Sequence, residues 1–144
     1  MGQNKVYLIG SLRNPQVPVV AQALRKLGFE VYDDWYAAGP EADDIWREYE
    51  QARGHTYQQA LDGWHAIHTF TNDLEHLSEA DGCVLVYPAG KSAHLEFGYC
   101  IGQGKWGLIL LEGESDRWDV MLQFGDGVHT SLPQLLDAAV RYLP

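Results

Sequence analysis

Four short apolar runs constrain the fold of this sequence more than any other feature. Each run is bounded by glycine, proline or polar residues, as buried strands commonly are. Residues with helical spacing fill most of the segments between the runs. Strands that alternate with helices favour an α/β protein whose parallel sheet carries helices on both faces. The predicted strands cover residues 6–9 (VYLI), 29–32 (FEVY), 82–87 (GCVLVY) and 107–111 (GLILL).

The segments between these strands predict several helices and one long loop. Apolar residues recur at helical spacing from Val17 to Leu27, and Gly28 follows them, as glycine often does at the end of a helix. Residues 33–51 are acidic and aromatic, and we expect them to form a long loop with a short helix over an opening. Further helices are predicted at residues 57–68, 71–80, 92–102 and 131–142.

The charge balance limits the partners of the chain. Ten Lys and Arg residues stand against twenty Asp and Glu, which gives a formal net charge of −10 over 144 residues. Proteins that bind a nucleic-acid polymer or an anionic membrane usually carry an excess of basic residues, so we expect neither partner. A small anionic ligand needs only a few well-placed donors. No repeat or linker divides the sequence, and we expect one domain over residues 1–144.

The termini, cysteines and histidines bear on location and metals. The first residues lack the regions of a signal peptide, and no apolar stretch approaches the roughly 18 residues of a membrane span. Cys83 and Cys100 lie in or beside apolar segments without metal-ligand spacing, so we expect reduced, buried thiols in a cytoplasmic protein. The histidines form no HExxH motif, and we expect no metal and no cofactor.

Functional residues are expected where the parallel strands end, because ligands bind at the carboxyl ends of strands in open α/β sheets. The turn after the first strand, Gly10-Ser11-Leu12-Arg13, combines backbone N–H groups with a hydroxyl and a guanidinium. These groups are suitable donors for an anion. A plain strand-to-helix turn with a solvated arginine is the alternative interpretation, and the residues alone leave it open.

The segment after the GCVLVY strand contains the strongest candidate nucleophile. Gly90-Lys91-Ser92 is similar to part of a phosphate-binding P-loop, but Leu85 occupies the position of its first glycine, which excludes that motif. With Ser92 as the helix cap, Glu96 lies one turn into the helix, where the helix dipole favours an ionised carboxylate. An acid that merely complements the dipole is the alternative. Gly98 is expected to let this helix approach the sheet closely.

A second carboxylate precedes the same strand. Asp73 lies in the segment TNDLEHLSEAD, and alone it is typical of an acid near a helix start. Two carboxylates that meet can cleave a glycosidic bond, one as nucleophile and one as acid or base. Sequence spacing does not establish whether Asp73 and Glu96 meet.

The ordered set of segments VYLIGSLR, NDLEHLSEAD and SAHLEFGYCIGQGK resembles the nucleoside 2-deoxyribosyltransferase superfamily. That superfamily includes the 2′-deoxynucleoside 5′-monophosphate N-glycosidases and the CMP hydrolases, and the resemblance covers residues 5–111. It implies a single flavodoxin-like domain. It also implies that Glu96 is the nucleophile, that Asp73 protonates the departing base and that Tyr7 lies near the sugar.

The resemblance extends to substrate-binding residues. Gly10, Ser11 and Arg13 are similar to the turn that holds the 5′-phosphate in the monophosphate N-glycosidases, and Ser92 resembles their second phosphate-binding serine. His94 lies in the sequence SAHLE, a variant of the family's motif around the glutamate. We place His94 among the binding residues without assigning it a role. Apart from the resemblance, Trp35, with Tyr36 and Trp46 as alternatives, is a candidate for stacking on the base, and packing within a lid is the alternative interpretation. A homodimer or higher homo-oligomer is expected by resemblance.

The sequence therefore predicts cleavage of the N-glycosidic bond of a (deoxy)nucleoside, with its 5′-monophosphate as the favoured substrate. Hydrolysis and transfer to a second base both stay open. A catalytically silent nucleotide-binding module of the same fold is the main alternative. A flavin-binding redox domain is disfavoured, because no cluster of hydroxyl residues follows the first strand.

Overall fold

A five-stranded parallel sheet forms the centre of the protein. The computed structural model describes residues 4–115 and 117–144. The strand order is β2-β1-β3-β4-β5, and every neighbouring pair runs parallel. This order is that of flavodoxin-like folds and confirms the predicted fold class. The strands are β1 (Lys5–Ile9), β2 (Glu30–Tyr32), β3 (Gly82–Val86), β4 (Trp106–Leu110) and β5 (Val128–His129).

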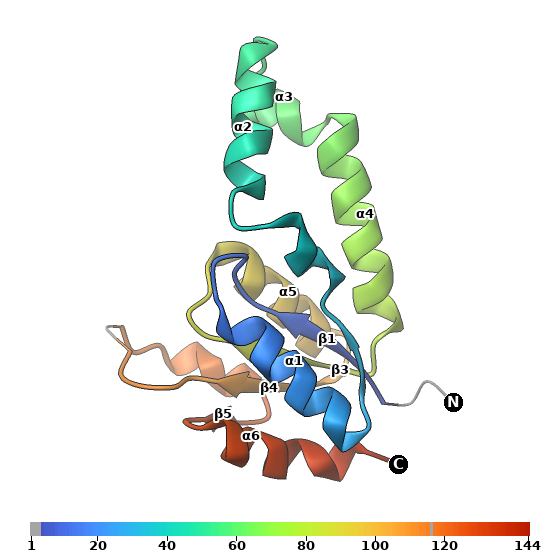
Figure 1. Ribbon diagram of the computed structural model, residues 1–144, viewed down its shortest axis with the longest axis vertical. Coiled ribbons are helices and arrows are strands. Elements are labelled where there is room, and N and C mark those ends of the chain that lie inside the picture. The colour runs from blue at the N-terminus through green and yellow to red at the C-terminus, as the bar shows by residue number, and fades with distance from the viewer. Residues whose placement is uncertain (1–3, 116) are drawn as a thin grey trace.

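Helices cover both faces of this sheet, as predicted (Figure 1). Helices α1 and α6 pack on one face, and α5 with the end of α4 packs on the other. The α-helices are α1 (Gln16–Leu27), α2 (Ala42–Ala52), α3 (Tyr57–Leu61), α4 (Trp64–Glu79), α5 (Lys91–Gly102) and α6 (Leu132–Ala139). Three short 3₁₀ helices are η1 (Asp34–Ala38), η2 (Val120–Phe124) and η3 (Val140–Tyr142).

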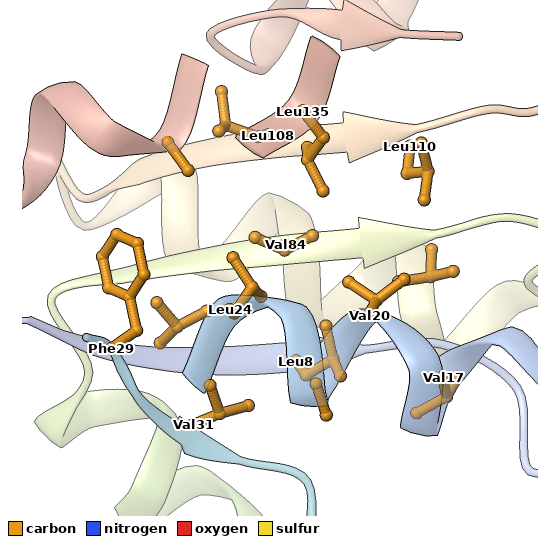
Figure 2. Packing of buried hydrophobic residues seen from close by; sticks show 14 residues of the cluster. Leu8, Val17, Val20, Leu24, Phe29, Val31, Val84, Leu108, Leu110 and Leu135 are labelled. Atoms are coloured by element: carbon orange, nitrogen blue, oxygen red, sulfur yellow. The ribbon is translucent and has the colours of Figure 1, made fainter. Parts of the chain in front are cut away.

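The alternation of side chains along the strands divides the core into two clusters. In β1, Val6 and Leu8 point to the α1 and α6 face, whereas Tyr7 and Ile9 point to the α4 and α5 face. Figure 2 shows the first cluster, in which α1 lies against β1 and β3. Tyr7 is therefore placed on the same face as α5, the helix that carries Glu96.

Local signals explain several helix boundaries. Gly28 ends α1 in the left-handed conformation, with φ of 114°, and its N–H donates to Arg25 and Leu24 carbonyls. Ser131 caps α6, because its side chain accepts a hydrogen bond from the Gln134 N–H. Both boundaries agree with the sequence predictions.

Two predictions for residues 33–80 were wrong. Residues 33–51 form η1 and most of an eleven-residue helix, α2, where a long loop with a short helix was expected. The expected break between helices near residue 70 is also absent, and α4 is continuous through it. The break occurs at Asp62-Gly63, after a short helix whose capping box joins Thr56 and Gln59. The two-residue strand β5 was not predicted, because so short a segment shows no alternation.

Helices α2 and α3 and the first half of α4 form an arm that extends away from the sheet (Figure 1). Within the described residues, no helix combines the length and the apolar character that crossing a membrane requires. Cys83 and Cys100 are free and buried, as predicted. The arm exposes a set of large apolar side chains: Ile45, Tyr49, Tyr57, Leu61, Trp64, Ile67 and Phe70.

Candidate active site

The predicted site residues gather where the strand order reverses. The chain runs from β1 to β2 on one side of β1 and then crosses to β3 on the other side. Loops at the carboxyl ends of β1 and β3 diverge at this point, which is where flavodoxin-like folds bind ligands. The turn at residues 10–14 follows β1, and the loop at residues 87–90 follows β3.

Tyr7 and Glu96 are in direct contact on the α5 face of the sheet. The Tyr7 hydroxyl donates a hydrogen bond of 2.8 Å to Glu96 Oε2. Tyr7 is 1% exposed in the middle of β1, and Glu96 is half-buried on α5. A short bond from a phenol to a carboxylate orients the carboxylate and stabilises its charge.

Burial controls the protonation of Glu96. The pKa of Glu96 is raised from 4.5 to about 7, chiefly by burial; the Tyr7 hydrogen bond lowers it and the charge of Asp73 raises it. The sequence predicted an ionised carboxylate stabilised by the helix dipole. In the structure, loss of water at Glu96 outweighs the hydrogen bond from the phenol, so the carboxyl group titrates near neutral pH.

Two details of α5 also differ from prediction. Helix α5 begins at Lys91 with Gly90 as its N-cap, so Ser92 lies inside the first turn and caps nothing. Gly98 faces solvent, and a Cβ built there would meet no atom within 4 Å. The close approach between α5 and the sheet occurs at Gly107 of β4, where a Cβ would lie 2.6 Å from Ile101 Cδ1.

Asp73 reaches the same region from α4. Its Oδ1 lies 3.5 Å from the Tyr32 hydroxyl, to which Asn72 Nδ2 donates at 3.2 Å. Burial raises the pKa of Asp73, and the Tyr32 and Asn72 side chains and the charge of His76 oppose this change. His76 stacks on Tyr32 with ring centroids 3.8 Å apart.

The three predicted catalytic residues lie within reach of one another's charges. The pKa of Tyr7 is raised by burial first, and then by the carboxylates of Glu96 and Asp73. Tyr32 lies between them, because its ring centroid is 5.2 Å from that of Tyr7 and its hydroxyl faces Asp73. Sequence reasoning missed Tyr32, although its place as the last residue of β2 was a usable signal.

A cavity of about 220 Å³ lies between the two diverging loops, which are close in the sequence to Tyr7 and Glu96. Gly10 leads into it, and a Cβ there would lie 3.0 Å from Val17 Cγ2 and 3.4 Å from the Val86 carbonyl oxygen, so a larger residue has little room. The Arg13 N–H donates to Ser11 Oγ at 3.1 Å, which shapes the turn. The cavity is lined by Ser11, Arg13, Asn14, Pro88, Ala89 and Gly90.

Asn14 ends the turn in which functional candidates were expected, but no role of its own was predicted for it. It is 2% exposed, and its Oδ1 accepts a hydrogen bond of 2.9 Å from the Gln16 N–H. Its Nδ2 lies 3.5 Å from the Pro88 carbonyl oxygen, which connects the β1 turn to the loop after β3. A polar residue before proline gave no signal beyond that of an ordinary turn.

The remaining predicted binding residues have other partners. Ser92 is exposed and does not line the cavity. His94 Nδ1 lies 2.7 Å from the Gly90 carbonyl oxygen, and its Nε2 lies 2.7 Å from the Tyr87 hydroxyl, so it ties the loop after β3 to α5. Trp35 donates from Nε1 to the Leu8 carbonyl at 2.8 Å and packs against the core. Their roles toward a ligand stay predictions.

The arrangement is suited to acid–base and nucleophilic chemistry. It holds one carboxyl group with a pKa of about 7, a second carboxyl group with a raised pKa and an adjacent phenol. Groups with such pKa values can exchange protons at neutral pH. Across residues 4–115 and 117–144, no group of three or more His, Cys, Asp or Glu side chains is arranged to hold a metal ion.

Solved structures share this architecture. A 2-deoxyribosyltransferase from the psychrotolerant bacterium Bacillus psychrosaccharolyticus matches with a TM-score of 0.60 and 19% sequence identity, over 91% of this chain and 89% of that chain. The chain has the fold of a 2-deoxyribosyltransferase. A conserved protein from Enterococcus faecalis V583 matches with a TM-score of 0.67 and 14% identity, over 97% of this chain and 99% of that chain. No protein-family model and no curated protein matches the sequence.

Proposed function

We propose that the protein cleaves the N-glycosidic bond of a (deoxy)nucleoside, that the 5′-monophosphate is the preferred substrate, and that Glu96 is the nucleophile. The hydrogen bond between Tyr7 and Glu96, with Asp73 close enough to act on both, is the observation that carries this proposal. The shared fold with a 2-deoxyribosyltransferase supports it.

In the first half of the proposed reaction, Glu96 replaces the base on the sugar. Tyr7 occupies Oε2, so Oε1, to which the described residues give no hydrogen bond, is the attacking atom. As the bond from Oε1 to C1′ forms, the bond from C1′ to the base nitrogen breaks and its electron pair leaves with the base. Asp73 donates a proton to the base, and burial raises its pKa, which is the direction that a general acid requires.

In the second half, the glycosyl ester on Glu96 is resolved. Water or the nitrogen of a second base attacks C1′, the bond to Oε1 breaks, and Glu96 is released as a carboxylate. Deprotonated Asp73 accepts the proton that the attacking group loses. Hydrolysis yields the free sugar phosphate, and transfer yields a new nucleotide.

The cavity beside Arg13 supports the preference for a 5′-monophosphate. Arg13 lines it together with Ser11 and the Asn14 amide, and these are the donors that a phosphate requires. The cavity lies at the carboxyl ends of β1 and β3, on the same edge of the sheet as the carboxylates of Glu96 and Asp73. A nucleoside without phosphate leaves these donors unused, so we expect it to be cleaved less efficiently.

A substrate panel tests the proposal. Purified protein is incubated with nucleosides and their 5′-monophosphates, with and without an acceptor base, and free base is measured by chromatography. We expect base release from at least one monophosphate, and a loss of at least about a thousandfold in the Glu96→Ala variant. Glu75→Gln, which changes an exposed acid on α4, is the matched control and should retain full activity.

Two results would contradict the proposal. Base release that persists in Glu96→Ala removes the nucleophile assignment. Binding of nucleotides without any turnover across the panel favours the alternative of a non-catalytic nucleotide-binding module. Equal cleavage of nucleosides and monophosphates contradicts only the phosphate preference.

The proposal includes a cytoplasmic homodimer or higher homo-oligomer in which residues 1–144 act as one domain. The exposed apolar residues of the arm support self-association, because monomers rarely expose so many large apolar side chains together. Light scattering coupled to gel filtration is the test. Ile67→Glu, on the exposed part of α4, should lower the measured mass, and a wild-type mass equal to 16.2 kDa contradicts an oligomer.

A further inference from the structure

Arg13, the cation that lines the proposed phosphate cavity, is already paired with an acid from another element. Its Nη2 lies 2.9 Å from Asp44 Oδ2, on the first turn of α2. Glu41, just before α2, places a second carboxylate oxygen 3.8 Å from the same nitrogen. The guanidinium therefore lies near two carboxylates from the start of the arm, and Arg13 also lines the cavity.

These carboxylates change what the cavity offers to an anion. The other polar side chains that line it, Ser11 and Asn14, are uncharged, so Arg13 supplies its positive charge. Asp44 and Glu41 offset that charge. A phosphate that enters must share the guanidinium with them or displace them, and either course costs electrostatic energy.

We infer that Asp44 is a specificity-determining residue that competes with the anionic group of the ligand for Arg13 and so weakens the hold of the cavity on a phosphate. The inference rests on the proposed function of Arg13. Its consequence is that phosphate alone binds poorly and that a ligand needs contacts from its sugar and base as well. A product that has lost its base then leaves more readily.

If Asp44 positioned Arg13 instead of competing with phosphate, its removal would change the phosphate affinity in the opposite direction. If Asp44 instead holds Arg13 in the orientation that binds phosphate, its removal frees a long side chain and weakens binding. Competition and positioning are thus separated by the direction of the change in affinity. Both partners of the ion pair are partly exposed, with side-chain exposures of 59% and 39%, so the effect is expected to be modest.

Calorimetric titration with inorganic phosphate at low salt and pH 7.5 provides the test. We expect Asp44→Asn to bind phosphate roughly two- to fivefold more tightly than the wild type, as the loss of one exposed charge pair implies. The double variant Asp44→Asn with Glu41→Gln should bind more tightly still. Asp44→Glu should restore the wild-type affinity, and Glu48→Gln, an exposed acid on the same helix, should leave it unchanged.

The same titration on Arg13→Gln separates failure of this inference from failure of the proposed function. Weaker or unchanged binding by Asp44→Asn, while Arg13→Gln loses binding, overturns only the role of Asp44. Binding by Arg13→Gln equal to that of the wild type overturns the phosphate cavity itself, and with it this inference. Failure of both the wild type and Asp44→Asn to bind phosphate counts against both proposals.

Discussion

The Tyr7 hydroxyl and the Glu96 carboxylate, 89 residues apart in the chain, are joined by a hydrogen bond of 2.8 Å between β1 and α5. The phenol cannot ionise at physiological pH, because burial and two carboxylates raise its pKa. It therefore acts as a permanent donor to Glu96. Its bond lowers the pKa of a carboxyl group that burial raises, which makes the pair testable through pH dependence.

Removal of the Tyr7 hydroxyl should shift the pH dependence of activity upward. Glu96 attacks as a carboxylate, so the rate falls as the pH drops through its pKa of about 7. In Tyr7→Phe the stabilising donor is lost, the pKa rises, and the midpoint of the acid limb moves up by about one pH unit. Profiles of kcat/KM against pH measure this. An unchanged midpoint contradicts the role of Tyr7.

Removal of the Asp73 charge should shift the acid limb of the pH profile to lower pH. Asp73 raises the pKa of Glu96 through its negative charge, so Asp73→Asn lowers the midpoint of the acid limb. The variant also lacks the proposed proton donor, and kcat should fall by about a hundredfold or more. A full kcat together with a lowered midpoint means that Asp73 acts on Glu96 but does not protonate the base.

Neutralising Glu96 should stabilise the fold at alkaline pH. The pKa of Glu96 is raised from 4.5 to about 7, so the folded state binds a proton more tightly than the unfolded state, and stability falls as the pH rises through that interval. Glu96→Gln removes this cost, and urea unfolding at pH 8 should show a gain of roughly 1–3 kcal/mol. The gain should shrink as the pH is lowered toward 4.5, and Glu75→Gln should show no such dependence.

The indole of Trp35 should contribute to stability through one hydrogen bond. Pairing of β1 with β2 ends at Tyr7, and Trp35 Nε1 donates a hydrogen bond to the carbonyl oxygen of the next residue, Leu8. Trp35→Phe leaves that buried carbonyl short of a donor and should cost about 1–3 kcal/mol. Trp46→Phe is the matched control, because Trp46 Nε1 is buried without a partner among the described residues and its loss should cost little. Equal costs in urea unfolding would contradict the assignment.

Two glycines should respond in opposite directions to alanine. Gly98 faces open space in the middle of α5, so Gly98→Ala should stabilise the protein by roughly 0.5–1 kcal/mol. A Cβ at Gly107 would lie 2.6 Å from Ile101 Cδ1 and 2.9 Å from Phe97 Cε1, so Gly107→Ala should destabilise it by about 1–3 kcal/mol. Urea midpoints with an unchanged m-value measure both effects.

The core and the main helices were predictable because their signals are local. A run such as GCVLVY is apolar throughout because both faces of β3 are buried, and Gly28 marks the end of α1 by a conformation that glycine adopts easily. The boundary between α3 and α4 was mispredicted. It depends on Asp62, which ends α3, and on Gly63, which is the N-cap of α4, whereas the apolar spacing continues on both sides of it.

The contacts of the site were not predictable from local signals. Asp44 lies in a segment expected to be a long loop with a short helix, and only the packing of α2 near the β1 turn brings it to Arg13. Tyr32 and Asp73 are 41 residues apart and meet because α4 returns along the sheet. The raised pKa of Glu96 was not foreseen, because the loss of solvent that causes it is not visible in a sequence.

The sequence by itself determined the central strands, the helices packed on the sheet and the polar residues at the strand ends, because hydrophobic spacing and turn residues act over a few neighbours. Only the tertiary structure decided which of those residues meet. The crossover from β3 to β4 places α5 over Tyr7, and the resulting burial sets the pKa of Glu96 near neutrality. Strand order and desolvation arise from contacts between distant segments, and these contacts turn separate carboxylates into one candidate site.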